Sequence, residues 1–169
     1  MPRALLRRLA RTAFVPPLVI WALVGPAVGG NETEAWSWPV KPPFGIVRDY
    51  VAPAHEYGPG HRGIDIAVRG ETSVRAPDDG VVAFADRVVD RGVVTIDHGG
   101  GIVSTLEPVE PTVVAGERVT RGAVVGTLSV GGHTAPGALH LGARLDGEYL
   151  NPLVLLGAMP RAVLLPYSG

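Results

Sequence analysis

The sequence predicts an all-β domain, folded as an antiparallel sandwich or a flattened barrel. Glycine (23 of 169 residues) and proline (16) are frequent, and valine falls in many short runs. One run alternates with period two, so that Val82 and Phe84 share one face and Ala83 and Ala85 share the other. Turn residues separate the runs at close intervals. These observations favour a β-rich, turn-rich domain over a helical bundle.

The expected elements follow one another along the chain from residue 64. Glycine, aspartate and proline residues mark the turns between them. The expected strands are Ile64–Val68, Ser73–Ala76, Gly80–Asp86, Val93–His98, Ile102–Leu106, Thr112–Val114, Ala123–Leu128 and Leu139–Leu145. Residues 152–156 are expected to form one helical turn.

The first thirty residues have the composition of an export segment. Four arginines lie within the first eleven residues, and residues 1–30 contain no acidic residue. An uncharged apolar stretch follows the arginines and ends in the small residues Ala27, Val28 and Gly29. This order is typical of a signal peptide, and an uncleaved membrane anchor that tethers the domain is the alternative. We therefore expect residues 1–30 to be a signal peptide or anchor. The rest should act outside the cytoplasm, either secreted or held at the outer face of the cytoplasmic membrane.

The remaining chain divides into three parts. Residues 31–60 are rich in proline and aromatic residues, and we expect an extended lead-in that wraps the surface of the core. Residues 61–156 form the expected β core. Residues 157–169 are an apolar tail to which the sequence assigns no structure.

Charge and cysteine content exclude several classes of function. The chain after residue 30 carries 11 of the 15 basic residues and all 16 acidic residues, so its formal charge is −5. Nucleic-acid binding needs a basic face, so nucleic acid is not an expected partner. The absence of cysteine excludes disulfides, thiol catalysis and thiolate metal sites.

Three residues form a common zinc-ligand pattern: His61 and Asp65, four residues apart, and His140 far along the chain. Alternate side chains of an extended segment share a face, so residues 61 and 65 can point the same way, and Gly63 leaves room for an ion. Three protein ligands leave the fourth position of a zinc open for water, as in catalytic sites. The alternative is that His61 is an exposed turn residue and Asp65 only bonds backbone amides.

Other chemistries lack the residues that they need. A lipoyl or biotinyl carrier needs a lysine at a hairpin tip, and the only lysine, Lys41, lies in the lead-in. No serine stands in the Gly-x-Ser-x-Gly turn of a serine hydrolase. The run of three glycines at residues 99–101 lacks the lysine and hydroxyl residue of a phosphate loop.

The metal pattern lies within motifs that resemble one protein family. Residues 60–67, Gly-His-Arg-Gly-Ile-Asp-Ile-Ala, are similar to the first motif of the lysostaphin-type, LytM-like zinc endopeptidases, which cut peptidoglycan cross-bridges and stem peptides. Similar segments follow in the family order at residues 74–82, 94–99, 116–126, 139–140 and 151–153. The resemblance implies a β core of the duplicated-hybrid-motif type and one Zn²⁺ held by His61, Asp65 and His140. It also implies peptidoglycan or its peptide stems as partner, and it identifies no protein partner.

Two residues depart from the pattern of that family. Its closing motif is His-x-His, and Ala138 stands in the first position of this motif. A further catalytic histidine lies in a Tyr-x-His-Leu strand, where the alignment from the preceding turn places Pro108. Neither side chain can carry a proton, and losing general acid–base help costs about 10²–10⁴-fold in rate per group. The sequence therefore assigns no catalytic residue.

Four other polar side chains are weighed as substitutes. His133, on the loop that enters the last strand, could reach water at the metal. Glu107 is next to Pro108, but strand alternation is expected to point it to the other face. His55 could line the cleft, and His98 is expected to be structural.

Two hypotheses of function remain open. The first is an exported zinc metalloendopeptidase that hydrolyses peptidoglycan peptides. The second is a catalytically degenerate relative that retains zinc and binds the cell wall or regulates another hydrolase.

Overall fold

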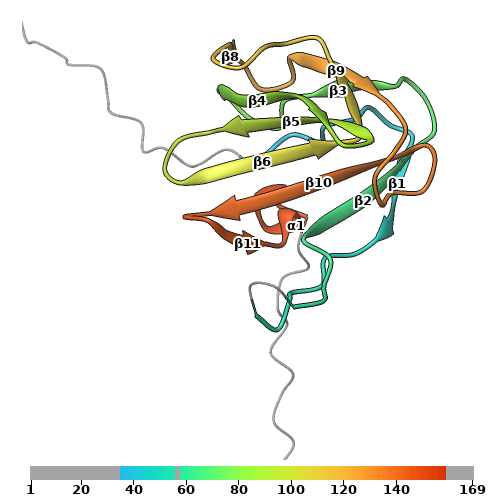
Figure 1. Cartoon of the computed structure of the whole chain (residues 1–169), viewed down its shortest axis with the longest axis vertical. Coiled ribbons are helices and arrows are strands. Elements are labelled where there is room, and N and C mark those ends of the chain that lie inside the picture. Colours follow the sequence, from blue (N-terminus) through green and yellow to red (C-terminus); the bar gives the residue numbers. More distant parts are fainter. Residues whose placement is uncertain (1–34, 56–57, 159–169) are drawn as a thin grey trace, which may run out of the picture. The chain divides into compact units, whose positions relative to one another are not determined.

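The protein is described from a computed structural model, which covers residues 35–55 and 58–158 (Figure 1). The predicted signal or anchor at residues 1–30, and residues 159–169 of the predicted tail, lie outside these ranges. Within the described ranges, no helix has both the length and the apolar character needed to cross a membrane. The predicted all-β class is confirmed, because antiparallel strands form two sheets in the described part of the chain and one short helix follows them there.

The larger sheet has the strand order β1-β2-β10-β6-β5-β4-β8, and β11 pairs with β10 at one end. Figure 1 shows β2, β10 and β6 side by side in this sheet. Its strands are β1 (Phe44–Arg48), β2 (Gly63–Val68), β4 (Gly80–Val88), β5 (Arg91–Asp97), β6 (Ile102–Glu107), β8 (Arg118–Val119), β10 (Ala138–Leu145) and β11 (Glu148–Leu150). The smaller sheet has the order β3-β9-β7, formed by β3 (Ser73–Arg75), β9 (Val124–Leu128) and β7 (Val109–Pro111).

Most expected elements are found close to their expected bounds. The helical turn is α1 (Pro152–Leu155), which Asn151 caps by accepting a hydrogen bond from the backbone N–H of Leu153. The prediction of a strand at residues 112–114 is wrong. The strand here is β7 (Val109–Pro111), which ends before these residues, and the chain bends at residues 112 and 113. This bend turns Val113 into the core and leaves Val114 68% exposed. The short strands β8 and β11 were not expected.

The lead-in contributes to the core as well as wrapping it. Trp36 is 5% exposed and Val40 is 2% exposed. The backbone N–H of Trp36 donates to the carbonyl of Leu155, which ties the start of the described chain to α1. Residues 44–48 of the lead-in form β1, which pairs with β2 and so continues the larger sheet.

Period-two alternation places the core and the functional residues on opposite faces of the larger sheet. In β2, Ile64 and Ile66 are fully buried in the core, and Asp65 between them points to the other face. Leu139 and Leu141 flank His140 in β10 in the same way. Burying each of these large apolar side chains contributes about 1.5–3 kcal/mol, so the core fixes which face the polar residues occupy.

His98 is structural, as expected. Its Nδ1 donates to the carbonyl of Asp79 (2.7 Å), and its Nε2 accepts from the hydroxyl of Ser104 (2.8 Å), which is fully buried. Burial lowers the pKa of His98 below its ordinary value of 6.5. The neutral ring therefore links the end of β5 to β6 and to the turn before β4.

We expect His98→Ala to lower the free energy of unfolding by about 1–3 kcal/mol at pH 7, because Ser104 loses a buried partner. A lowered folded-state pKa means that the unfolded chain binds the proton more readily. The stabilisation is present above the ordinary pKa of 6.5 and is lost as the pH falls from 6.5 through the lower pKa of the folded state. Urea unfolding at pH 5 and pH 7 should show a smaller pH difference in His98→Ala than in the wild type. An unchanged difference, with exposed His55→Ala as control, would contradict this role.

Candidate metal centre

The structure brings the three predicted ligands together on the outer face of the larger sheet. Asp65 in β2 and His140 in β10 are direct partners in the antiparallel register. Their side chains therefore lie next to each other, because opposite residues share a face. His61 precedes β2 and is held by an isolated bridge to Val51. All three are at least 93% buried, so His61 is not the exposed turn residue of the alternative.

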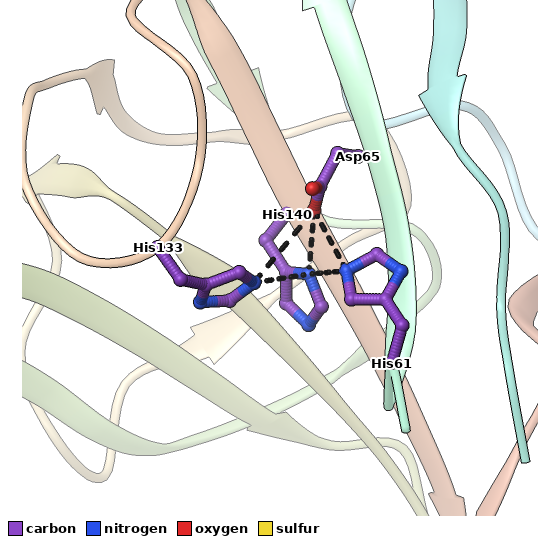
Figure 2. Close-up of side chains that lie close together, drawn as sticks. All are labelled: His61, Asp65, His133 and His140. Atoms are coloured by element: carbon purple, nitrogen blue, oxygen red, sulfur yellow. Dashed lines mark hydrogen bonds and ion pairs between the residues drawn. The ribbon is translucent and has the colours of Figure 1, made fainter. Parts of the chain in front are cut away.

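The donor atoms of these residues converge on one point (Figure 2). His61 Nε2 lies 3.1 Å from Asp65 Oδ1 and 3.2 Å from His140 Nδ1. His140 Nδ1 lies 2.8 Å from Asp65 Oδ1. A triangle of two imidazole nitrogens and one carboxylate oxygen is a donor set that suits Zn²⁺.

The orientation of His61 supports a metal at this point. Its Nδ1 lies 2.7 Å from the carbonyl oxygen of Asp49, which can only accept, so Nδ1 carries the proton. Nε2 is then the nitrogen that can offer a lone pair to a metal, and it lies 3.1 Å from Oδ1 of Asp65. Two acceptors at this distance need a cation or a proton between them. A second hydrogen bond that fixes the tautomer is usual for metal-binding histidines.

Asp65 is held as a carboxylate. Burial by itself raises its pKa, but the hydrogen bond with His140 and the charges of the surrounding histidines outweigh burial. The pKa of Asp65 therefore lies below its ordinary value. An ionised carboxylate is the form that binds a metal.

Gly63 has a different role from the one expected. A Cβ at this residue would lie 2.6 Å from Nε2 of His140 and would collide with the backbone oxygen of Leu141. The absent side chain therefore makes room for the imidazole ring of His140 and for the close approach of β10, rather than directly for an ion.

A fourth side chain reaches the same point from the loop between β9 and β10. In Figure 2, His133 and His61 approach from opposite sides, with Asp65 and His140 between them. His133 Nε2 lies 3.3 Å from His140 Nδ1 and 3.8 Å from Asp65 Oδ1. One donor atom from each of the four residues lies within 4.8 Å of the others. Burial, and next the charge of His140, lower the pKa of His133, which favours its neutral form.

A cleft of about 500 Å³ opens beside the cluster. His61, His133 and His140 lie in its wall. Four arginines also line the cleft, namely Arg48, Arg62, Arg91 and Arg144. The chain has a formal charge of −1, so this concentration of positive charge is local to the site.

The sequence pattern of Peptidase family M23 matches residues 59–152, which is more than half of the chain and contains all four clustered residues. This chain belongs to peptidase family M23. The resemblance to lysostaphin-type enzymes is thereby confirmed, and the family fit agrees with a metal site of His and Asp ligands.

Curated proteins and solved structures are similar to this chain in sequence or in fold. The uncharacterized protein Rv2891 of Mycobacterium tuberculosis is 34% identical over 91% of this chain, which spans 63% of that relative's length. The DD-carboxypeptidase/endopeptidase Mpg of Neisseria meningitidis is 34% identical over 55% of this chain and 22% of its own length. A zinc containing peptidase from Vibrio cholerae shares the fold, with a TM-score of 0.61 and 20% identity over 70% of this chain and 39% of its own.

The two departures from the M23 pattern leave no imidazole at the expected positions. Ala138 is 2% exposed and lies two residues before His140 in β10, so it faces the same side of the sheet. Pro108 is buried directly after β6 and is absent from the cleft wall. His55 also does not line this cleft, which contradicts the role considered for it.

Glu107 points into the cleft, which corrects the expectation that it faces away. Leu106 is fully buried in the core, so Thr105 and Glu107 on either side of it face the cleft. Glu107 is directly opposite His140 in the β6–β10 register. Its Oε2 accepts from Nε of Arg91 (2.8 Å), and its Oε1 lies 3.5 Å from Nδ1 of His133. The sequence-based expectation was wrong because it took Pro108 as the residue that faces the site. Its neighbour Glu107 was then expected to face away, but the strand ends at Glu107 and Pro108 lies beyond it.

Proposed function

We propose that this M23 domain is a zinc-dependent hydrolase of peptide bonds in peptidoglycan. The observation that carries the proposal is the convergence of His61, Asp65 and His140 in the wall of a cationic cleft. These residues would hold the metal. A bound Zn²⁺ supplies a Lewis acid that polarises a peptide carbonyl and acidifies water.

The arginines of the cleft support a peptide substrate that carries carboxylates. Arg62 and Arg144 lie over the ring of Tyr149, at 5.5 Å and 6.0 Å from its centroid. Stacking on one ring orients both guanidinium groups, and a guanidinium binds a carboxylate through two parallel hydrogen bonds. Peptidoglycan stem peptides carry free carboxylates, so their charge is complementary to this wall. The name of the Neisseria relative, an endopeptidase and DD-carboxypeptidase, agrees with such a substrate.

Glu107 is the carboxyl group that we assign to proton transfer. It faces the cleft beside the cluster, in a chain that lacks the two further histidines of the M23 pattern. Hydrolysis adds water to the carbonyl carbon, breaks the C–N bond and delivers a proton to the departing amine. Glu107 would take the proton from water and return it to the nitrogen.

We expect the full chain, loaded with one equivalent of Zn²⁺, to release new amino termini from purified cell walls. Glu107→Gln should lower this rate by about 10²–10⁴-fold at saturating zinc, because the amide cannot accept the proton. Glu110→Gln, the same change at an exposed residue of β7, is the matched control and should keep the wild-type rate. A wild-type rate in Glu107→Gln would remove Glu107 from the mechanism.

The second candidate is a zinc-retaining domain that binds the wall without cutting it. Ala138 and Pro108 favour it, because neither replaces the lost imidazoles. Retained wall binding by the zinc-loaded wild type, with no release of amino termini, would support this candidate and reject the hydrolase. For either function we propose a location outside the cytoplasm, supported by the composition of residues 1–30.

A further inference from the structure

We propose that His133 is a fourth zinc ligand, which completes a tetrahedral shell with His61, Asp65 and His140 and closes the metal's open position. The inference rests on the proposed function, because it requires that the domain hold zinc. It goes further in assigning a closed resting state to the site.

The distances between the donor atoms lie on both sides of the edge length of a tetrahedral zinc shell. Zinc binds nitrogen and oxygen donors at about 2.0–2.2 Å, so the edges of a tetrahedral shell measure about 3.3–3.6 Å. The three edges among His61, Asp65 and His140 measure 2.8–3.2 Å. His133 adds edges of 3.3 Å to His140 and 3.8 Å to Asp65, and its separation from the His61 donor is within 4.8 Å. The fourth donor thus lies close enough to the other three to share one ion with them.

These distances separate a ligand from a general base. A base acts on water at the metal from one hydrogen bond further out, about 2.6–3.2 Å beyond the water oxygen. His133 Nε2 lies 3.3 Å from His140 Nδ1, which is the length of an edge of the zinc shell. This separation favours a ligand over the surrogate base considered from the sequence.

The other ring nitrogen of His133 has the partner that metal-binding histidines usually have. Nδ1 faces Oε1 of Glu107 at 3.5 Å, and Arg91 holds the other oxygen of that carboxylate at 2.8 Å. A carboxylate behind a histidine orients its ring and raises its basicity as a ligand. Glu107 can therefore hold His133 in the closed state, and it is free to act on water only when His133 leaves.

The loop that carries His133 is fastened to the turn between β4 and β5. The backbone N–H of Gly132 donates to Oδ2 of Asp90 (3.0 Å). A Cβ on Gly131 or Gly132 would press on the backbone of Asp90 or the side chain of Arg91. Both glycines also have positive φ, of 122° and 69°. The packing of this loop on the β4–β5 turn therefore depends on two adjacent glycines. It places the next residue, His133, beside the donor atoms of His61, Asp65 and His140.

The half-exposed setting of His133 distinguishes it from the other three ligands. Its side chain is 39% exposed, whereas those of His61, Asp65 and His140 are 4–8% exposed. Three ligands are thus fixed by the sheet and its bridge, and the fourth comes from a loop at the surface of the cleft. Displacement of this one side chain would open the metal to water or to a peptide carbonyl.

The first test measures zinc affinity of the full chain by competition with a chromogenic chelator. We expect His133→Ala to weaken zinc binding by at least about 10–100-fold, the range already seen when a residue behind a ligand is lost. His55→Ala, at an exposed histidine outside the cluster, is the control and should bind as the wild type does. Equal affinities of wild type and His133→Ala would overturn the fourth ligand.

The second test asks whether the metal has an open position, using the visible absorption of Co²⁺-substituted protein. Added imidazole should change the spectrum of Co²⁺-loaded His133→Ala, because it fills the vacated position. It should leave the wild-type spectrum unchanged. An equal response of both proteins would overturn the proposal. Failure of the wild type to hold Zn²⁺ or Co²⁺ at all would instead reject the zinc site of the proposed function, so the two failures are distinguishable.

Discussion

His140→Ala should abolish specific zinc binding and, with it, any stabilisation by zinc. The side chain lies at the centre of the cluster, within 3.3 Å of donor atoms of the other three residues. A ligand that binds only the folded state at 1,000 times its dissociation constant stabilises that state by about 4.1 kcal/mol. Thermal unfolding with and without zinc measures this term. The melting temperature of the wild type should rise with zinc, and that of His140→Ala should not change.

The metal-free proteins provide the control for this prediction. His140 is 7% exposed, so its truncation leaves a small cavity in addition to removing a ligand. With a chelator present to keep both proteins free of metal, the difference in melting temperature between the wild type and His140→Ala measures the cost of the cavity alone. A zinc-dependent rise in melting temperature that survives in His140→Ala would show that the metal binds elsewhere, and the proposed site would be wrong.

Gly63→Ala should disrupt the metal site while leaving every ligand in the sequence. The added Cβ would collide with the backbone oxygen of Leu141 and lie 2.6 Å from Nε2 of His140, so β10 or the imidazole ring must shift. Overpacking of this kind costs about 1–3 kcal/mol in stability. A metal ligand must lie within a few tenths of an ångström of its ideal distance from the ion. Because the shift would move Nδ1 of His140, we also expect zinc affinity to fall at least tenfold.

Gly45→Ala is the matched control for this substitution. Gly45 lies in β1, opposite Ala67 of β2, and a Cβ there meets no atom within 4 Å. Its stability should change by no more than about 0.5 kcal/mol, with unchanged zinc affinity. Denaturant unfolding and chelator competition on both variants measure the two effects. If Gly63→Ala bound zinc as tightly as the wild type does, the ring of His140 would not need the space that the missing side chain of Gly63 leaves.

The position of Glu107 shows where sequence reasoning stopped short. Period-two alternation is correct for β6, since Leu106 is buried and Glu107 faces the cleft. The expectation failed because it took Pro108 as the residue facing the site. That choice depended on counting along the preceding turn, and a single residue of register exchanges the two faces of a strand.

Local patterns determined the class of this protein and most of its strands. Short valine-rich runs between glycine and proline turns predict β structure, because such residues pack on a pleated surface and turns need their backbone freedom. The motifs around His61, Asp65 and His140 predicted the M23 family from residue identity alone.

Only the tertiary structure decided how the site is completed. Asp65 and His140 are 75 residues apart and meet because β2 and β10 pair in one register. His133 reaches them because Asp90, 42 residues before Gly132, fastens its loop. Such long-range pairings depend on the summed burial of the core and on backbone contacts between distant segments. No local pattern in the sequence records them, so the approach of His133 to the other three donors became visible only in the fold.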